Sequence, residues 1–123
     1  MRLAITSMGE TLESPVDPRF GRARYFVVYD FDNDRWDVVD NASALNAAQG
    51  AGIEAAQRVV GTGAEGLATG HCGPKAFAAL RAAGITVFVG AAGTIRDVVD
   101  RYRRGALEPA TVPDVDAHSG GGR

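Results

Sequence analysis

Reactive side chains are scarce in this chain of 123 residues, which has one cysteine, one lysine, one tryptophan and two histidines. A single cysteine excludes an internal disulfide and favours a reducing compartment. One cysteine and two histidines are too few for an ordinary structural zinc site. The longest uncharged run, 82–95, is shorter than the ~20 residues that a membrane span requires. The N-terminal apolar run is too short for a signal peptide, so we expect a cytoplasmic protein.

Neither sign of charge is in large excess, since the net charge is −2. Residues 1–104 contain 12 basic and 12 acidic side chains, and the small acidic excess lies in the rest of the chain. This balance predicts no nucleic-acid or membrane partner. The hydrophobic fraction of 46% is typical of a globular protein.

Short apolar runs separated by glycine and proline divide the chain into eight elements. The expected strands are residues 3–5, 25–31, 36–39, 67–69 and 85–89. The expected helices are residues 46–60, 74–83 and 95–102, the last preceded by the capping-box pair Thr94 and Asp97. In the first helix, Ile53, Ala56 and Val60 share one face. Gly50 and Gly52 weaken this helix, which indicates close packing there or a later start.

The resulting order, β-β-β-α-β-α-β-α, predicts the fold. Right-handed crossovers make the strands at 3–5, 67–69 and 85–89 parallel, and the hairpin at 25–39 extends one edge antiparallel. The predicted class is therefore α/β, with a ribonuclease H-like, five-stranded mixed sheet. Residues 1–104 form a single domain, and residues 105–123, with two prolines and the sequence SGGG, are expected to be a flexible tail.

Ligands of such sheets bind beyond the carboxyl ends of the parallel strands. Three predicted loops meet at that edge, namely residues 7–24, 70–73 and 90–93. Each contains glycine, which lets the backbone approach a ligand closely. The last two loops each precede a helix, whose first N–H groups favour anions.

Two enzymatic interpretations follow from these patterns. Metal-dependent nuclease chemistry needs carboxylates clustered on the strands. The strands at 3–6 and 67–69 have none, which argues against a nuclease. The run GHCG places Cys72 just before a helix, whose N-terminus stabilises a thiolate. A thiol-dependent enzyme acting on a small anionic substrate is therefore an alternative. The competing interpretation is that a lone cysteine is a small buried hydrophobe.

Four stretches together resemble the dinitrogenase iron–molybdenum cofactor-biosynthesis family, also called nitrogenase accessory factor-like. They are SPVDPRFGRARYFVVYD, GAGIEAAQRVV, ATGHCGPKAFAALRAAGITVF and GAAGTIRDVVDRY. The resemblance extends from residue 1 to about residue 104. It implies a ribonuclease H-like, cofactor-binding domain that carries, stores or helps to insert a metal–sulfur cofactor, without catalysis of its own. The implied partners are the cofactor and the proteins that assemble or accept it.

The resemblance also implies a site. A metal–sulfur cluster is anionic and takes soft or imidazole ligands, with N–H donors around its sulfides. His71 and Cys72 are the predicted metal ligands, and both side chains should then be at least partly exposed. Lys75 and the loop arginines would balance the charge of the cluster. The residues predicted to surround the cofactor are Ser7, Gly9, Arg19, Gly21, Arg22, Gly70, Gly73, Lys75, Gly93 and Thr94.

A third possibility is a regulatory module that binds a partner and no cofactor. Visible absorption by protein purified without oxygen distinguishes a carrier of a metal–sulfur cofactor, such as the iron–molybdenum cofactor or a relative of it, from both alternatives.

Overall fold

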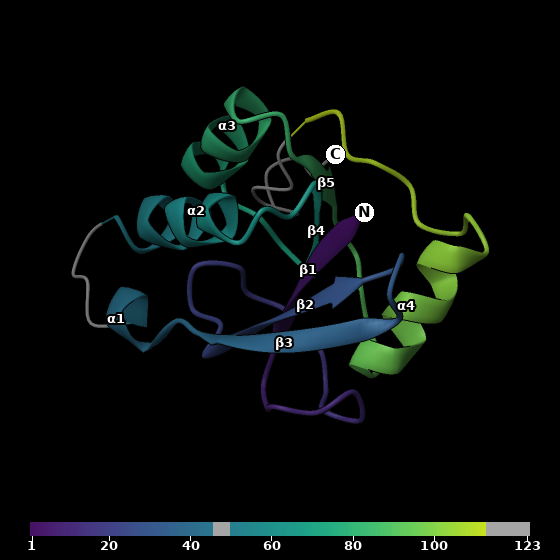
Figure 1. Ribbon diagram of the computed structural model, residues 1–123. Helices are drawn as coiled ribbons and strands as arrows, with labels where there is room; N and C mark the ends of the chain where they lie inside the picture. The colour runs from purple at the N-terminus through teal and green to yellow at the C-terminus, as the bar shows by residue number, and fades with distance from the viewer. Residues whose placement is uncertain (46–49, 113–123) are drawn as a thin grey trace.

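A computed structural model of the protein describes residues 1–45 and 50–112. Figure 1 shows a sheet with α2 and α3 on one face and α4 on the other. Within the described ranges, no helix combines the length and the apolar character that crossing a membrane requires. The elements are β1 (Arg2–Ser7), β2 (Tyr25–Asp30), β3 (Arg35–Asp40), α1 (Ala42–Leu45), α2 (Ala51–Gly61), β4 (Gly66–Ala68), α3 (Pro74–Ala82), β5 (Thr86–Phe88) and α4 (Ile95–Arg103).

The five strands form one sheet in the order β3-β2-β1-β4-β5. The β1–β2 and β2–β3 pairs are antiparallel, whereas the β1–β4 and β4–β5 pairs are parallel. This arrangement confirms the predicted mixed α/β sheet with the hairpin on one edge. The ribonuclease H-like label, which was predicted from the order of the elements, stays a prediction. Because β1 and β4 are neighbours, the loops that follow them start side by side.

Alternation along β1 divides the core between the two faces of the sheet. Ala4 belongs to the apolar cluster under α2 and α3, whereas Leu3 and Ile5 belong to the cluster under α4. All three side chains are fully buried. Complete burial of a leucine or isoleucine stabilises the fold by about 1.5–3 kcal/mol, so β1 holds both helical layers in place.

The helix expected at 46–60 differs from the structure. Helical residues occur in α1, at 42–45, and again in α2, from Ala51, and residues 46–49 lie outside the described residues. Gly50 has φ +81°, a left-handed conformation that a right-handed helix cannot include, so α2 starts after it. The buried face of α2 consists of Ala55, Ala56 and Val59. Val60, which was predicted to share a face with Ile53 and Ala56, lies outside this buried face, since 46% of that residue is exposed.

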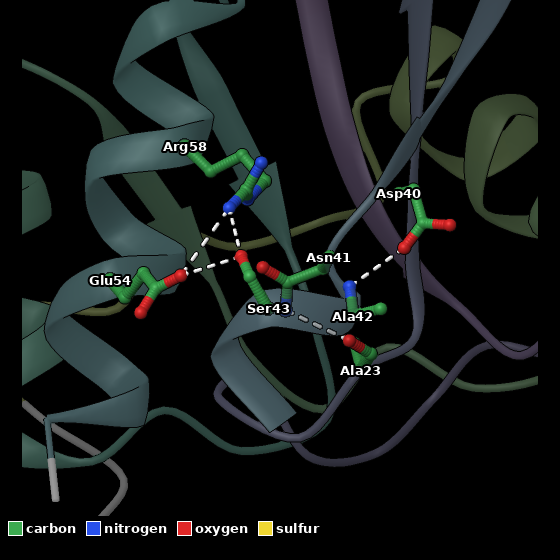
Figure 2. Close-up of polar contacts among 7 residues, drawn as sticks. All are labelled: Ala23, Asp40, Asn41, Ala42, Ser43, Glu54 and Arg58. Carbon is green, nitrogen blue, oxygen red and sulfur yellow. Dashed lines mark hydrogen bonds and ion pairs between the residues drawn. The ribbon is translucent and has the colours of Figure 1, made fainter. Parts of the chain in front are cut away.

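The segment between β3 and α2 ties the end of the long loop before β2 to α2 (Figure 2). Asn41 is fully buried, and its Nδ2 donates to the Ala23 carbonyl at 2.8 Å. Ser43 Oγ donates to Glu54 Oε2 at 2.6 Å, and the Arg58 guanidinium donates to both groups. Asn41 Oδ1 and Arg58 Nε are the buried side-chain polar atoms that lack a hydrogen-bond partner within the described parts of the chain. These contacts give the loop and α2 a common support.

The chain after α4 returns to the free edge of β5. Leu107 packs against the cluster under α4, and the Ala110 N–H donates to the Val87 carbonyl at 2.7 Å. Packing therefore continues to about residue 110, beyond the predicted domain end at residue 104. The rest of the predicted tail, residues 113–123, lies outside the described residues.

Candidate functional site

A cavity of about 500 Å³ lies where the long loop before β2 meets the starts of α2 and α3. The sequence predicted six of its lining residues, which come from two separate segments: Arg19, Gly21, Arg22, His71, Gly73 and Lys75. Phe20, Gly52, Pro74 and Ala76 complete the lining and were not predicted as site residues. The sequence did contain signals that could have pointed to two of them, because Gly52 is a glycine early in a helix and Pro74 is a proline at a helix start.

Backbone hydrogen bonds bring the arginine-bearing loop to the segment before α3. The His71 N–H donates to the Pro18 carbonyl at 2.7 Å, and the Phe20 N–H donates to the His71 carbonyl at 3.2 Å. A Cβ atom on Gly70 would lie 2.7 Å from the Pro18 Cα and oxygen. Glycine is therefore required at position 70 for the two segments to approach. Gly70, a predicted site residue, shapes the cavity and is not one of the residues that line it.

Two further glycines bring the helix starts together. A Cβ atom on Gly21 would lie 3.1 Å from the Gly52 backbone nitrogen, and one on Gly52 would lie 3.3 Å from the Ala76 Cβ. Both distances are tighter than ordinary van der Waals contact. The wall of the cavity is therefore built from closely packed backbone.

The charged side chains of the cavity lining are Arg19, Arg22 and Lys75, and no carboxylate is among the described lining residues. The Arg19 N–H donates to Asp17 Oδ1 at 3.0 Å, and the Arg19 Nε lies 3.9 Å from the same oxygen. The Asp17 side chain is only 7% exposed, whereas that of Arg19 is 66% exposed. The buried carboxylate thus supports the base of Arg19 while its guanidinium remains open to solvent.

The starts of α2 and α3 add positive potential to the same place. Within the described parts of the chain, no side chain caps either helix. The first N–H groups of a helix carry a partial positive charge and favour anions. Together with Arg19, Arg22 and Lys75, they make the cavity suitable for an anionic group.

The remaining walls are apolar or backbone. Phe20, Pro74 and Ala76 contribute carbon surface, and none of the described lining residues is a serine, threonine, asparagine or glutamine. Three or more His, Cys, Asp or Glu side chains do not come together as a metal-ion site anywhere in the described ranges. The donor set therefore does not fit a bare metal ion held by protein ligands alone. It fits a larger anion that meets cations, one imidazole and apolar surface.

The expectation of an exposed Cys72 is wrong. Cys72 is 0% exposed and belongs to the apolar cluster under α2 and α3, with Phe20 and Phe77. His71 and Gly73 on either side of it are exposed. The chain is extended here, so alternate side chains point in opposite directions. His71 therefore lines the cavity, whereas the sulfur of Cys72 lies beneath it.

Besides Gly70 and Cys72, four predicted site residues lie outside the cavity lining: Ser7, Gly9, Gly93 and Thr94. Ser7 is fully buried, and its Oγ donates to the Gly9 carbonyl at 2.7 Å. The Gly93 carbonyl accepts from the Val16 N–H at 2.9 Å. Thr94 forms the predicted capping box with Asp97 at the start of α4. These residues hold the first half of the long loop against α4.

The start of α4 differs electrostatically from those of α2 and α3. The Ile95 and Arg96 N–H groups donate to the carbonyls of Ser14 and Leu12, at 3.0 and 2.8 Å. The Asp97 N–H donates to Thr94 Oγ1 at 3.1 Å. Because these donors are already used, α4 offers a ligand fewer N–H groups than a helix without a capping side chain.

A second hollow, of about 750 Å³, lies between the end of α2 and the hairpin. Its charges are mixed, because three arginines and two aspartates line it: Arg2, Arg35, Arg58, Asp30 and Asp37. The mixed lining suits a single anion less well than the cationic cavity does.

Comparison with known proteins agrees with the fold. The model of the dinitrogenase iron-molybdenum cofactor family matches residues 1–105. The apo form of the orange protein from Desulfovibrio gigas is 45% identical, with 92% of this chain and 95% of that chain covered and a TM-score of 0.90. A putative NifB protein from Thermotoga is 38% identical, with 90% and 94% covered and a TM-score of 0.79.

A more distant relative is an uncharacterised protein of Methanocaldococcus jannaschii, 25% identical over 96 residues that cover 76% of this chain and 80% of that protein. The family match spans nearly the whole described fold, including every residue that lines the cavity. The chain therefore belongs to the dinitrogenase iron-molybdenum cofactor family.

Proposed function

We propose that the protein binds an anionic metal–sulfur group of the iron–molybdenum type as cargo, and carries it or helps to insert it without catalysis of its own. The observation that carries the proposal is the cavity with three cations and no carboxylate in its described lining, at the starts of two helices. Membership of a family named for this cofactor supports the proposal.

The combination of cations and apolar surface in the cavity supports a sulfur-rich anion over a compact oxyanion. An ion loses solvation when it enters a site, and the loss must be recovered from the groups that it contacts. Phe20, Pro74 and Ala76 provide no hydrogen bonds to a compact, strongly hydrated anion. A larger group with its charge spread over several sulfides loses less solvation and gains contact with these carbon surfaces.

His71 is the proposed direct ligand, because its imidazole is exposed at the cavity and suits several transition metals. Cys72 is buried, so we assign it to packing beneath His71. Attachment through one imidazole and several charge contacts suits a carrier, which must also release its cargo. The proposed protein partners are those that assemble or accept the cofactor, and the proposed compartment is the reducing cytoplasm.

The relative from Desulfovibrio gigas adds further support. It is called the orange protein and is described in its apo form. A protein that is named for its colour and also exists in an apo form has a coloured group that can be removed. Burial of Cys72 counts against the thiol-dependent enzyme, whose nucleophile would have to reach its substrate.

Tetrathiomolybdate, a soluble molybdenum–sulfide dianion, tests the proposal by anaerobic equilibrium dialysis. Arg19→Ala and Arg22→Ala should each weaken binding by up to about fivefold at low salt, since an exposed charge contact contributes ~0.2–1 kcal/mol. The salt dependence should also become shallower. Arg104→Ala, an exposed arginine outside the lining, is the matched control. Equal affinities of all four proteins at every salt concentration would contradict the proposal.

A further inference from the structure

Thr6, at the carboxyl end of β1, holds the backbone of Asp17 at two points. The Asp17 N–H donates to the Thr6 carbonyl at 2.9 Å, and Thr6 Oγ1 donates to the Asp17 carbonyl at 2.6 Å. Thr6 is 0% exposed and Asp17 is 5% exposed. The arginine-bearing loop is therefore attached to the sheet immediately before Pro18 and Arg19.

Thr69 extends this contact to the next strand. In the parallel pairing of β1 with β4, Ile5 lies opposite Ala68, so Thr6 and Thr69 are the next residues along. Their hydroxyl oxygens are 2.9 Å apart, and Thr69 is also 0% exposed. Thr6 Oγ1 is placed to donate to both the Asp17 carbonyl and Thr69 Oγ1. Thr69 Oγ1 is therefore the second acceptor of the Thr6 hydroxyl.

The two threonines join the segments that meet at the cavity. Thr6 fixes Asp17, whose carboxylate accepts from the Arg19 N–H. Thr69 comes two residues before His71 in the chain, and the two segments then exchange the Pro18–His71 and Phe20–His71 backbone hydrogen bonds. A chain of buried hydrogen bonds from Thr69 through Thr6 to Asp17 thus precedes the point where Arg19 and His71 reach the same cavity.

We propose that Thr6 and Thr69 are positioning residues for the anion site, which hold the Arg19 loop against His71 so that both side chains face one ligand. This inference rests on the proposed function. Neither threonine lines the cavity, so they act on a ligand only through the geometry of the loop. Isosteric Thr69→Val removes the hydroxyl while keeping the volume, whereas Thr69→Ser keeps the hydroxyl.

The test measures two properties of the full chain. The first is the amide hydrogen exchange of Phe20 and His71, which report the bonds between the two segments. The second is tetrathiomolybdate affinity under anaerobic conditions. Thr69→Val should speed exchange at both amides and weaken binding roughly fivefold, which corresponds to one hydrogen bond of about 1 kcal/mol. Thr69→Ser should restore both properties.

Thr62→Val is the matched control, because it removes a hydroxyl that donates to the Val59 carbonyl at 2.6 Å, outside the cavity lining. It should leave both amides and the affinity unchanged. A Thr69→Val protein with native exchange at Phe20 and His71, or with native affinity, would overturn the inference. Failure of the wild-type protein to bind tetrathiomolybdate would overturn the proposed function, and the exchange rates would still decide whether the threonines position the loop.

Discussion

Gly52 of α2 and Ala76 of α3 hold the starts of their helices in contact, since a Cβ atom on Gly52 would lie 3.3 Å from the Ala76 Cβ. Gly52→Ala must therefore push α2 away from α3 by a few tenths of an ångström and widen the cavity. We expect weaker tetrathiomolybdate binding, measured by anaerobic equilibrium dialysis, because the helix starts no longer converge on one anion.

Gly61→Ala is the control, because a Cβ atom there meets no atom within 4 Å. It should raise stability by up to about 1 kcal/mol through helix propensity and leave binding unchanged. Native affinity in the Gly52→Ala protein would show that the contact between the helix starts does not shape the site.

Burial of Cys72 predicts slow reaction with alkylating reagents at neutral pH in the native protein. Cys72→Ser should lower the free energy of unfolding by about 1–3 kcal/mol, because it buries a hydroxyl in an apolar cluster. Alkylation followed by mass spectrometry and chemical denaturation measure the two effects. Rapid labelling of the folded protein, with unchanged stability of the serine variant, would return Cys72 to the list of candidate ligands.

The turn of the hairpin predicts a dependence of stability on acid. The Tyr29 hydroxyl, followed by the Arg103 guanidinium, holds the pKa of the Asp34 carboxyl below its ordinary value. A lowered pKa in the folded state stabilises the fold above the unfolded pKa, about 4, and this stabilisation is lost as the pH falls through the folded pKa. Asp34→Asn should therefore lower the thermal midpoint at pH 7, and the difference from wild type should vanish in strong acid. A difference of equal size at both pH values would contradict this account.

The segment after α4 predicts different effects for two truncations. Ending the chain after Arg104 removes Leu107 from the core and the Ala110–Val87 backbone hydrogen bond. We expect a loss of about 1–3 kcal/mol in the free energy of unfolding. Ending the chain after Val112 keeps these contacts and should leave stability unchanged. Equal stability of both truncated proteins in urea denaturation would show that the segment adds nothing to the fold.

The sequence predicted the sheet because its signals are local and consistent. Glycine and proline separate the apolar runs, and the handedness of crossovers then makes β1, β4 and β5 parallel. The same logic brought Arg19, His71 and Lys75 to one edge, since loops at the carboxyl ends of neighbouring strands must meet.

Other features depend on contacts that periodicity does not reveal. Cys72 lies in an extended segment too short to show alternation, so the sequence could not decide between an exposed ligand and a buried side chain. The donors at the start of α4 are used by carbonyls of Leu12 and Ser14, which are distant in sequence. The buried face of α2 differs from the predicted one, because the helix packs through small residues, which hydrophobic patterns mark weakly.

Metal and sulfide analysis of protein purified without oxygen, from cells supplied with molybdenum and iron, tests the central claim most directly. The account predicts a coloured protein that absorbs visible light and contains bound metal together with inorganic sulfide. His71→Ala should lose most of this material while remaining folded, because His71 is exposed. Colourless wild-type protein that contains neither metal nor sulfide, and that takes up no tetrathiomolybdate, would contradict the account.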